Sequence, residues 1–299
     1  MLLDRSTPVF EKIRAIFTLL RVYTTPFYIP AVLSGFILAG NLNISEIVLF
    51  TIVVLFILFL TNTLNFYYDE QADILHPMAY AENPFTRQIL TSKEALTISL
   101  FFSITPIVIS LLLGVFWVLG AITGLFLGII YNVKPFRLKA KPYGWFVDAA
   151  LSPPLAFLFA YTVASSSFVY PNHILMSAAF FYFAFVPIVT KDIPDMNADA
   201  SVNDRTFPIV FGIKTTQVAV VSSIAVTFFF YLLLTLTGVI SFLGLPIALF
   251  SMTGVSKLVL RRDKLMDRSY VYLKICIAGV SSFSLIFVVS LIMKTIFNR

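Results

Sequence analysis

Charged residues and cysteine are both scarce in this sequence. Asp, Glu, Lys and Arg together make up 12% of its 299 residues, whereas a soluble domain usually carries about 25% charged residues. Hydrophobic residues account for 59%, and the mean hydropathy is +0.93. No single soluble core of this length buries so much apolar surface, so the composition predicts a protein embedded in lipid. The single cysteine, Cys276, excludes an internal disulfide and a multi-cysteine metal site.

The motifs of several soluble enzyme classes are missing as well. We find no glycine-rich phosphate loop, no zinc-ligand spacing and no serine triad. The two histidines, His76 and His173, are expected on opposite sides of the membrane, so they do not share a site. The net charge of +6 is explained by membrane topology, and no nucleic-acid partner is expected. Residues 1–21 are mixed and polar and do not resemble a cleavable signal.

Segments without any charge predict the membrane spans. A spanning helix needs about 20 apolar residues, and the charge-free segments are 22–45, 47–68, 95–133, 149–190, 215–256 and 275–293. Three of them are about twice the length of one span, so each is predicted to be a helical hairpin. Breaks are expected at Gly114–Gly120, Ser165–His173 and Gly238–Pro246. The sequence therefore predicts one all-α membrane domain over residues 1–299, with nine transmembrane helices around a central chamber.

The distribution of charge predicts the orientation. With nine spans, one side holds the N-terminus and segments 69–94, 134–148, 191–214 and 257–268. Of 21 Lys and Arg residues, only Lys294 and Arg299 fall on the other side. Because cytoplasmic loops carry the excess of Lys and Arg, we expect a multi-pass protein of the cell membrane with its N-terminus in the cytoplasm and its C-terminus outside.

Two groups of acidic residues lie on the predicted cytoplasmic side. The first aspartate stripe, at the end of the second span, is Asn65, Asp69 and Asp73, spaced i, i+4, i+8. The second aspartate stripe, after the sixth span, is Asp192, Asp195 and Asp199, spaced i, i+3, i+7. On a helix each set shares one face. Pro194 is expected to break the sixth helix and start a short new one.

Five aspartates in two stripes repel one another unless cations neutralise them. Mg²⁺ takes oxygen ligands and is usually held by one or two carboxylates together with substrate phosphates. Two facing stripes are suited to holding two or three such ions around a diphosphate. We therefore predict that Asn65 and the five aspartates bind metal, and that the five aspartates are the catalytic residues. The alternative is that these are ordinary solvated acids near helix ends.

Basic residues surround the two stripes. Cations near a leaving diphosphate stabilise the negative charge that develops as its C–O bond breaks. On this basis the predicted diphosphate-binding residues, besides Asn65, are Arg87, Lys134, Arg137, Lys139, Lys191 and Arg205. The alternative, which stays open, is that these residues only mark the cytoplasmic side. Segments 69–94 and 191–214 are expected to complete an active site that opens toward the cytoplasm.

Two further ionisable residues lie close to the predicted membrane boundary. Asp148 opens the fifth span, and Arg21 comes just before the first. Ionisable groups at such depth are costly and are candidates for function. For Asp148 the alternative is an acid near a helix N-terminus, where the helix dipole favours negative charge.

At this point the sequence resembles the UbiA superfamily of intramembrane prenyltransferases. The first stripe matches that family's Asn-x-x-x-Asp-x-x-x-Asp motif, and the second matches its Asp-x-x-Asp-x-x-x-Asp motif. The similarity continues through Tyr131–Lys139 and Arg205–Gly212. The resemblance implies that Mg²⁺ ions bind the diphosphate of an isoprenyl donor, which ionises to an allylic cation that alkylates a lipophilic acceptor. Arg21, Tyr131 and Asp148 are the candidates for the acceptor side.

The sequence also departs from the family pattern. Many members have Asp after the first Asn, where this chain has Phe66, and the segment Asn83–Gln88 lacks the second proline found in some members. The stretch with Pro135, Arg137, Lys139 and Pro142 is reminiscent of carotenoid-elongating members. A geranylgeranyl donor is expected. The acceptor is left open among a phenolic quinone precursor, a glycerol-phosphate ether lipid, a carotenoid and a tetrapyrrole.

Two other functions compete with this interpretation. Carboxylates at a membrane boundary also serve cation-coupled transporters, although such acids are expected near the midplane and within inverted repeats. A CDP-alcohol phosphotransferase also uses Mg²⁺, but its single Asp-rich signature is absent here.

Overall fold

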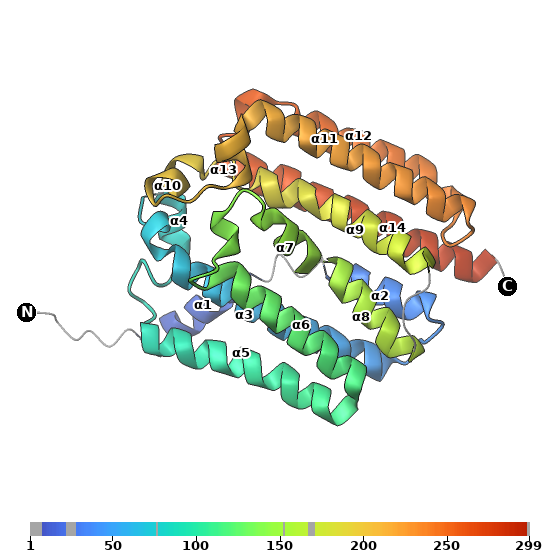
Figure 1. Ribbon diagram of the computed structural model, residues 1–299, viewed down its shortest axis with the longest axis horizontal. Helices are drawn as coiled ribbons and strands as arrows, with labels where there is room; N and C mark the ends of the chain where they lie inside the picture. The colour runs from blue at the N-terminus through green and yellow to red at the C-terminus, as the bar shows by residue number, and fades with distance from the viewer. Residues whose placement is uncertain (1–7, 22–27, 76, 152, 167–170, 298–299) are drawn as a thin grey trace, which may run out of the picture.

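Long α-helices run side by side through the molecule and enclose an apolar core (Figure 1). The computed structural model describes residues 8–21, 28–75, 77–151, 153–166 and 171–297. Among these residues there are helices but no strands, which confirms the all-helical fold class. The elements of the bundle are α2 (Ile29–Leu38), α3 (Ile44–Asp73), α5 (Ser92–Leu113), α6 (Val115–Asn132), α7 (Gly144–Leu151), α8 (Pro153–Ser165), α9 (Pro171–Thr190), α11 (Phe207–Leu236), α12 (Leu245–Val259) and α14 (Ile277–Phe297).

Short elements gather at one end of the bundle. They are α4 (Pro77–Glu82), α10 (Met196–Ser201) and α13 (Arg268–Tyr270) (Figure 1). A further helix, α1 (Val9–Leu20), packs against α3. The long helix α14 ends at the opposite end of the molecule (Figure 1). Within the described residues, seven helical segments are long and apolar enough to cross a membrane, in α3, α5, α6, α7–α8, α9, α11 and α12. The expected count of nine spans and the sidedness of the termini stay predictions.

The three hairpin breaks lie where the sequence predicts them. Between α5 and α6 the chain turns at Gly114, whose φ of 135° is readily adopted by glycine and rarely by L-residues. The helix α8 ends at Ser165 and α9 begins at Pro171. After α11 the chain turns through Gly238, with φ of 70°, before α12 begins. Glycine and proline therefore place the turns that divide the long apolar segments.

The first predicted span differs from the structure. In place of one helix over 22–45, the described residues form α1, which ends at Leu20, and α2, which has 10 residues. The amide of Asn62 in α3 donates to the carbonyl of Leu20 (3.2 Å). Lys12 of α1 forms an ion pair with Glu94 at the start of α5 (2.6 Å). These contacts attach α1 to the bundle, although its charges led us to expect a polar segment outside it.

Small residues let helices approach closely at two places in the bundle. An ideal Cβ at Gly35 of α2 would lie 2.7 Å from the Cβ of Ala160 in α8. A Cβ at Gly128 of α6 would lie 2.6 Å from Oγ1 of Thr61 in α3. Both positions therefore require glycine, as is common where membrane helices pack tightly. The second contact holds α6 against the half of α3 that carries the first aspartate stripe.

Candidate active site

Both aspartate stripes face one polar pocket at the end of the bundle where α10 and α13 lie. The last turns of α3 supply Asn65, Asp69 and Asp73, and the segment after α9 supplies Asp192, Asp195 and Asp199. The pocket encloses about 690 Å³, including its open mouth. Other lining residues are Arg21, Tyr131, Lys139, Lys191, Asp204, Arg268 and Tyr272. Segments more than 100 positions apart in sequence therefore meet in one site.

The second stripe is not the single helical face that its spacing suggests. The helix α9 ends at Thr190, and α10 begins only at Met196, with Asp195 as its N-cap residue. Asp192 therefore lies in the turn between the two helices, and Asp199 lies on α10. Pro194 lies in this turn, as expected, because proline lacks the N–H that would continue the helix.

Cations neutralise the first stripe at its centre. Asp69 forms ion pairs with Arg137 (Nη2 to Oδ1, 3.2 Å) and with Lys139. With its amide oriented to satisfy both neighbours, Asn65 donates to Asp69 (3.1 Å) and accepts from Lys139 (3.2 Å). These charge-assisted contacts fix the carboxylate at the pocket wall.

Asn83 positions the last residue of the first stripe. Its side chain is fully buried, and its Nδ2 donates both to Oδ2 of Asp73 (2.7 Å) and to the carbonyl of Phe66 (2.8 Å). This asparagine belongs to the Asn83–Gln88 segment in which the sequence departs from the family pattern. Its contact shows that the segment supports the first stripe from behind.

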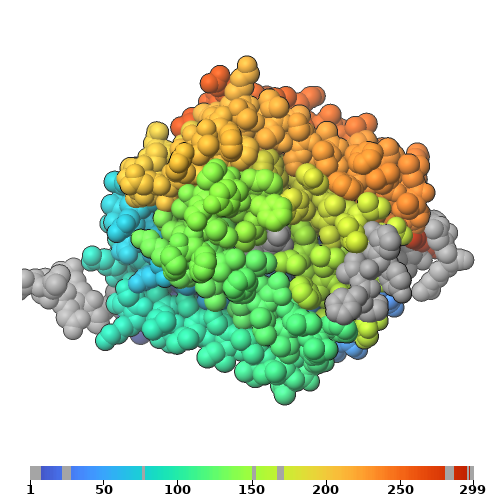
Figure 2. Space-filling view, in the orientation of Figure 1, coloured from blue at the N-terminus to red at the C-terminus, as the bar shows by residue number. Residues whose placement is uncertain are grey.

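The 134–141 segment joins the two halves of the site. Arg137 binds Asp69 and also donates from Nη1 to Asp204 (2.7 Å), and the backbone N–H of Arg205 donates to the carbonyl of Ala140 (2.8 Å). In the space-filling view, residues near 140 (green) lie against residues near 205 (gold) on the front face (Figure 2). The half-buried guanidinium of Arg137 therefore couples the loop after α6 to the loop after α10.

Burial opposes ionisation of the second stripe. It raises the pKa of Asp192 to about 7, against the opposing effect of the Lys191 ammonium. It raises the pKa of Asp199 to about 8, and the nearby carboxylates of Asp192 and Asp69 add to that rise. Both shifts have the sign expected for acids crowded together away from water. A pocket of this kind is suited to binding cations.

The donors present fit Mg²⁺ bound together with a phosphate ligand. Carboxylate and amide oxygens are the ligands that this ion takes. Within the described residues, no three acidic, histidine or cysteine side chains converge on one point as a protein-only metal cage would require. Mg²⁺ seldom needs such a cage, because it keeps waters and shares its coordination with substrate phosphates.

Asp148 marks the inner limit of the polar pocket. Its Oδ2 accepts a hydrogen bond from the hydroxyl of Tyr131 (3.0 Å) and one from the ammonium of Lys191 (2.8 Å). Asp148 lies on α7, Tyr131 at the end of α6 and Lys191 just after α9. Two helices and the turn after a third therefore bring these polar groups together.

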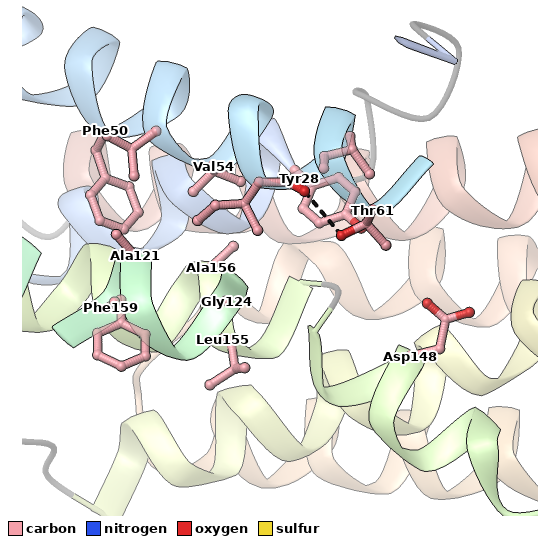
Figure 3. A pocket seen from close by; sticks show the side chains of 14 residues that line it. Tyr28, Phe50, Val54, Thr61, Ala121, Gly124, Asp148, Leu155, Ala156 and Phe159 are labelled. Atoms are coloured by element: carbon pink, nitrogen blue, oxygen red, sulfur yellow. Dashed lines mark hydrogen bonds between the residues drawn. The ribbon is translucent and has the colours of Figure 1, made fainter. Parts of the chain in front are cut away.

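An apolar pocket continues inward from Asp148. It lies between α3, α6 and α8 and encloses about 590 Å³, including its mouth. Figure 3 shows Phe50 at one end of this pocket and Asp148 at the other, with Ala121 and Phe159 along its walls. Asp148 lines the apolar pocket, whereas its partners Tyr131 and Lys191 line the polar one. The two pockets therefore meet at this hydrogen-bonded group.

Arg21 and Phe66 explain one departure from the family pattern. The guanidinium of Arg21 lines the polar pocket and lies over the ring of Phe66, 4.2 Å from its centroid. The Phe66 ring is buried in a cluster with Leu19 and Phe85 and does not line the pocket. Because position 66 does not line the pocket, a phenylalanine there leaves the number of pocket carboxylates unchanged. The Phe66 ring instead provides an aromatic face for Arg21.

Not all of the predicted residues come together. Lys139 and Lys191 line the polar pocket, and Arg137 supports it through Asp69. The side chains of three others are exposed and do not line it: Arg87, Lys134 and Arg205. They lie on the outer faces of loops whose inner faces form the site. His76 lies outside the described residues.

Sequence reasoning missed Arg268 and Tyr272 as pocket residues. The basic residues of 257–268 are predicted only to mark the cytoplasmic side, and the predicted diphosphate-binding residues lie in segments that contain the aspartates or adjoin them. Nothing in the sequence sets Arg268 apart from the other basic residues of this segment.

The sequence from residue 27 to residue 277 matches the model of the UbiA prenyltransferase family. The chain belongs to this family. It is therefore a membrane prenyltransferase. Membership in this family also sets aside the transporter alternative, as does the position of the first stripe in the last turns of α3.

Relatives of this UbiA-family prenyltransferase extend the comparison. The digeranylgeranylglyceryl phosphate synthase of Methanobrevibacter smithii is 26% identical over 202 residues, which are 66% of this chain and 69% of the relative. The structure of a UbiA homolog from Archaeoglobus fulgidus bound to DMAPP and Mg²⁺ superposes with a TM-score of 0.68 and 20% identity, covering 89% of this chain and 99% of that one. An apo UbiA homolog from Aeropyrum pernix gives 0.68 and 16%, covering 90% and 99%. At these identities the two structures establish a shared fold.

Proposed function

We propose that this prenyltransferase transfers an isoprenyl group from its diphosphate to a lipophilic acceptor and releases pyrophosphate, with Mg²⁺ as cofactor. The observation that carries the proposal is the junction of the two pockets. A charged pocket with both aspartate stripes adjoins an apolar pocket, because Asp148 of the apolar pocket bonds to Tyr131 and Lys191 of the charged one. An isoprenyl diphosphate has the same division, with a charged head and an apolar tail.

The polar pocket is proposed to bind the diphosphate. The residues that would hold two or more Mg²⁺ ions are Asn65, Asp69, Asp73, Asp192, Asp195 and Asp199. When bound, Mg²⁺ neutralises the diphosphate and so makes it a better leaving group. Lys139 and Lys191 line the same pocket and would add positive charge beside the departing oxygen. The A. fulgidus structures, described as bound to DMAPP or GPP together with Mg²⁺, support this division of roles.

The chemical step is proposed to begin with ionisation of the donor. The bond between the allylic carbon and the diphosphate oxygen breaks, and its electron pair leaves with pyrophosphate. The resulting allylic cation forms a new bond to the acceptor, which then loses a proton. Walls such as Val54, Ala121 and Phe159 exclude water that would otherwise quench the cation.

The donor and the acceptor are proposed from the pocket and from relatives. Along α3 the apolar pocket extends from Phe50 to Thr61, or roughly 16 Å at 1.5 Å rise per residue. That length suits a chain of several isoprene units, and we propose geranylgeranyl diphosphate as the donor. Two relatives described as digeranylgeranylglyceryl phosphate synthases favour a glyceryl phosphate lipid as the first acceptor to test. The site is proposed to open toward the cytoplasmic side of the cell membrane.

The proposal is tested with purified protein in detergent. Radiolabelled geranylgeranyl diphosphate is incubated with a crude lipid extract, in Mg²⁺ or in EDTA, beside an Asp69→Ala/Asp195→Ala double variant. We expect a labelled lipid that forms only with Mg²⁺ and is lost in the variant, and mass spectrometry identifies the acceptor. If neither a product nor pyrophosphate appears across donor lengths and acceptors, the proposal fails.

A further inference from the structure

Arg268 is a buried cation of the polar pocket that the reaction as proposed so far does not use. It begins α13, between α12 and α14, and only 9% of its surface is exposed. It lines the pocket together with both aspartate stripes. No other arginine or lysine from this part of the chain lines that pocket in the described residues.

The neighbours of Arg268 hold it only loosely. Its Nη1 lies 3.5 Å from Asp195 and its Nη2 lies 3.7 Å from Glu82, distances beyond those of good hydrogen bonds. Its guanidinium carbon lies 5.2 Å from the centre of the Tyr272 ring. Its Nη1 is buried and makes no hydrogen bond with any residue in the described part of the chain. A buried guanidinium nitrogen without an acceptor is costly, so the arrangement favours an incoming anion.

A structural role alone does not account for this geometry. The side chain of Glu82 is 50% exposed, and an ion pair with so exposed a partner contributes little to stability. Asp195 belongs to the second stripe, whose carboxylates are proposed to bind Mg²⁺. Once a metal ion neutralises Asp195, the guanidinium beside it needs another negative partner. Phosphate oxygens match the planar fork of arginine, which binds them through charge-assisted hydrogen bonds.

We infer that Arg268 is a substrate-binding residue whose Nη1 donates to a non-bridging oxygen of the diphosphate. This inference rests on the proposed function. Arg268 approaches from α13, whereas Lys139 approaches from the 134–141 segment, so cations from two separate loops hold the diphosphate. After the C–O bond breaks, the same contact holds pyrophosphate, so Arg268 affects binding of both donor and product.

The test compares four variants by the donor KM, kcat and inhibition by inorganic pyrophosphate in Mg²⁺. Arg268→Gln removes the charge, Arg268→Lys keeps the charge and loses the fork, Glu82→Gln removes the exposed partner, and Arg262→Gln is the matched control. Arg262 is exposed in the same loop and does not line the pocket.

We expect Arg268→Gln to raise the donor KM and the pyrophosphate inhibition constant together by roughly 10- to 150-fold, the effect of one charged hydrogen bond. Arg268→Lys is expected to fall between it and the wild type, and the other two to stay within about threefold of wild type.

Two results would overturn the inference. One is a fall in kcat for Arg268→Gln with KM and pyrophosphate inhibition unchanged. The other is an equal effect of Glu82→Gln, which would show that Arg268 only ties α4 to α10. Should Arg268→Gln fail to fold, Arg268→Lys decides the matter, because a wild-type pyrophosphate constant in that variant also contradicts the inference. Calorimetric titration with Mg²⁺ and pyrophosphate measures pyrophosphate binding to each variant without catalysis. If the wild type binds pyrophosphate but forms no prenylated lipid, the proposed function fails, and the titration of the Arg268 variants still decides the inference.

Discussion

Asp192 and Asp199 are the carboxylates on which burial in the polar pocket acts most strongly, with pKa values raised to about 7 and about 8. The first stripe differs, because Arg137 and Lys139 bind Asp69 directly. In the proposed reaction, Mg²⁺ supplies to the second stripe the positive charge that loop cations already supply to Asp69 in the first. The two stripes are therefore not equivalent, although their sequence motifs look alike.

Replacing Asp199 tests the role of the second stripe. Asp199→Asn keeps the size of the side chain and removes a ligand charge, and we expect kcat/KM to fall roughly 100-fold or more. The matched control is Asp263→Asn, because Asp263 is exposed outside the pocket, and its activity is expected to stay at wild-type level. Rates of labelled lipid formation at saturating Mg²⁺ measure both. An Asp199→Asn enzyme within threefold of wild type would contradict the metal-binding role.

Asp148 is expected to act on the acceptor and not on ionisation of the donor, because it lies where the two pockets meet. In Asp148→Asn we expect prenyl transfer to fall roughly 100-fold, within the range for lost acid–base catalysis. Pyrophosphate release is expected to fall less, because water then captures part of the cation. The ratio of pyrophosphate to prenylated lipid therefore rises above one, and separate assays measure each product.

Tyr131→Phe is the matched comparison, because it keeps the Asp148 carboxylate and removes one of its hydrogen bonds. A smaller change in the same ratio is expected. If pyrophosphate and lipid fall in parallel in Asp148→Asn, the residue acts before the acceptor does and its assignment to the acceptor side is wrong.

At the scale of single helices, α6 carries small residues on the face that borders the apolar pocket. Gly120, Ala121 and Gly124 line the pocket opposite α3 and α8. A Cβ at Gly124 would lie 3.0 Å from Cδ1 of Ile57, so larger side chains on this face would have to extend into the pocket or displace its walls. The width of the proposed donor site is therefore set by one helix face.

Enlarging that face is expected to select shorter donors. Ala121 is 1% exposed, and Ala121→Leu places three additional carbon atoms in the pocket. We measure kcat/KM for geranylgeranyl diphosphate and for dimethylallyl diphosphate and divide the first by the second. We expect this ratio to fall roughly 10- to 200-fold, the range by which steric exclusion from an apolar pocket discriminates between substrates. Ile122→Leu, at an exposed position on the same helix, is the control and should leave the ratio unchanged. An unchanged ratio in Ala121→Leu would place the donor tail elsewhere.

At the scale of the whole molecule, α10 and α13, which contribute to the polar pocket, lie at one end of the bundle, and the turn between α2 and α3 lies at the other (Figure 1). The excess of Lys and Arg predicts that the pocket end is cytoplasmic. This orientation would let a charged isoprenyl diphosphate enter from the cytoplasm while the apolar pocket stays within the bilayer.

Cysteine labelling in intact cells tests that orientation. In a Cys276→Ala background, Leu42→Cys is placed at the exposed turn after α2, and Lys264→Cys in the exposed loop after α12. A membrane-impermeant maleimide should label Leu42→Cys in intact cells and Lys264→Cys only after permeabilisation. The reverse pattern would invert the predicted topology, and labelling of both sites in intact cells would contradict the predicted number of spans between them.

Much of the architecture and the centre of the site could be predicted from the sequence. Hairpin turns could be predicted because Gly114 and Gly238 interrupt apolar segments, and a backbone break leaves a local signal in glycine or proline. The aspartate stripes could be predicted because carboxylates next to a membrane helix are costly unless a ligand needs them. Arg268 and Phe66 could not be assigned, because sequence does not reveal whether a side chain faces the pocket or the core.

A helical fold, an apolar surface suited to lipid and two aspartate stripes could all be predicted from the sequence, because hydrophobicity, helix periodicity and charge are local properties. The folded structure was needed to show which cations reach the aspartates, since Arg137 and Lys139 contact Asp69 while Arg87, Lys134 and Arg205 stay exposed. It also decided that Asp148 joins a polar pocket to an apolar one. Such contacts depend on how α3, α6, α7 and α9 pack together, and packing between distant segments leaves no pattern in any one of them.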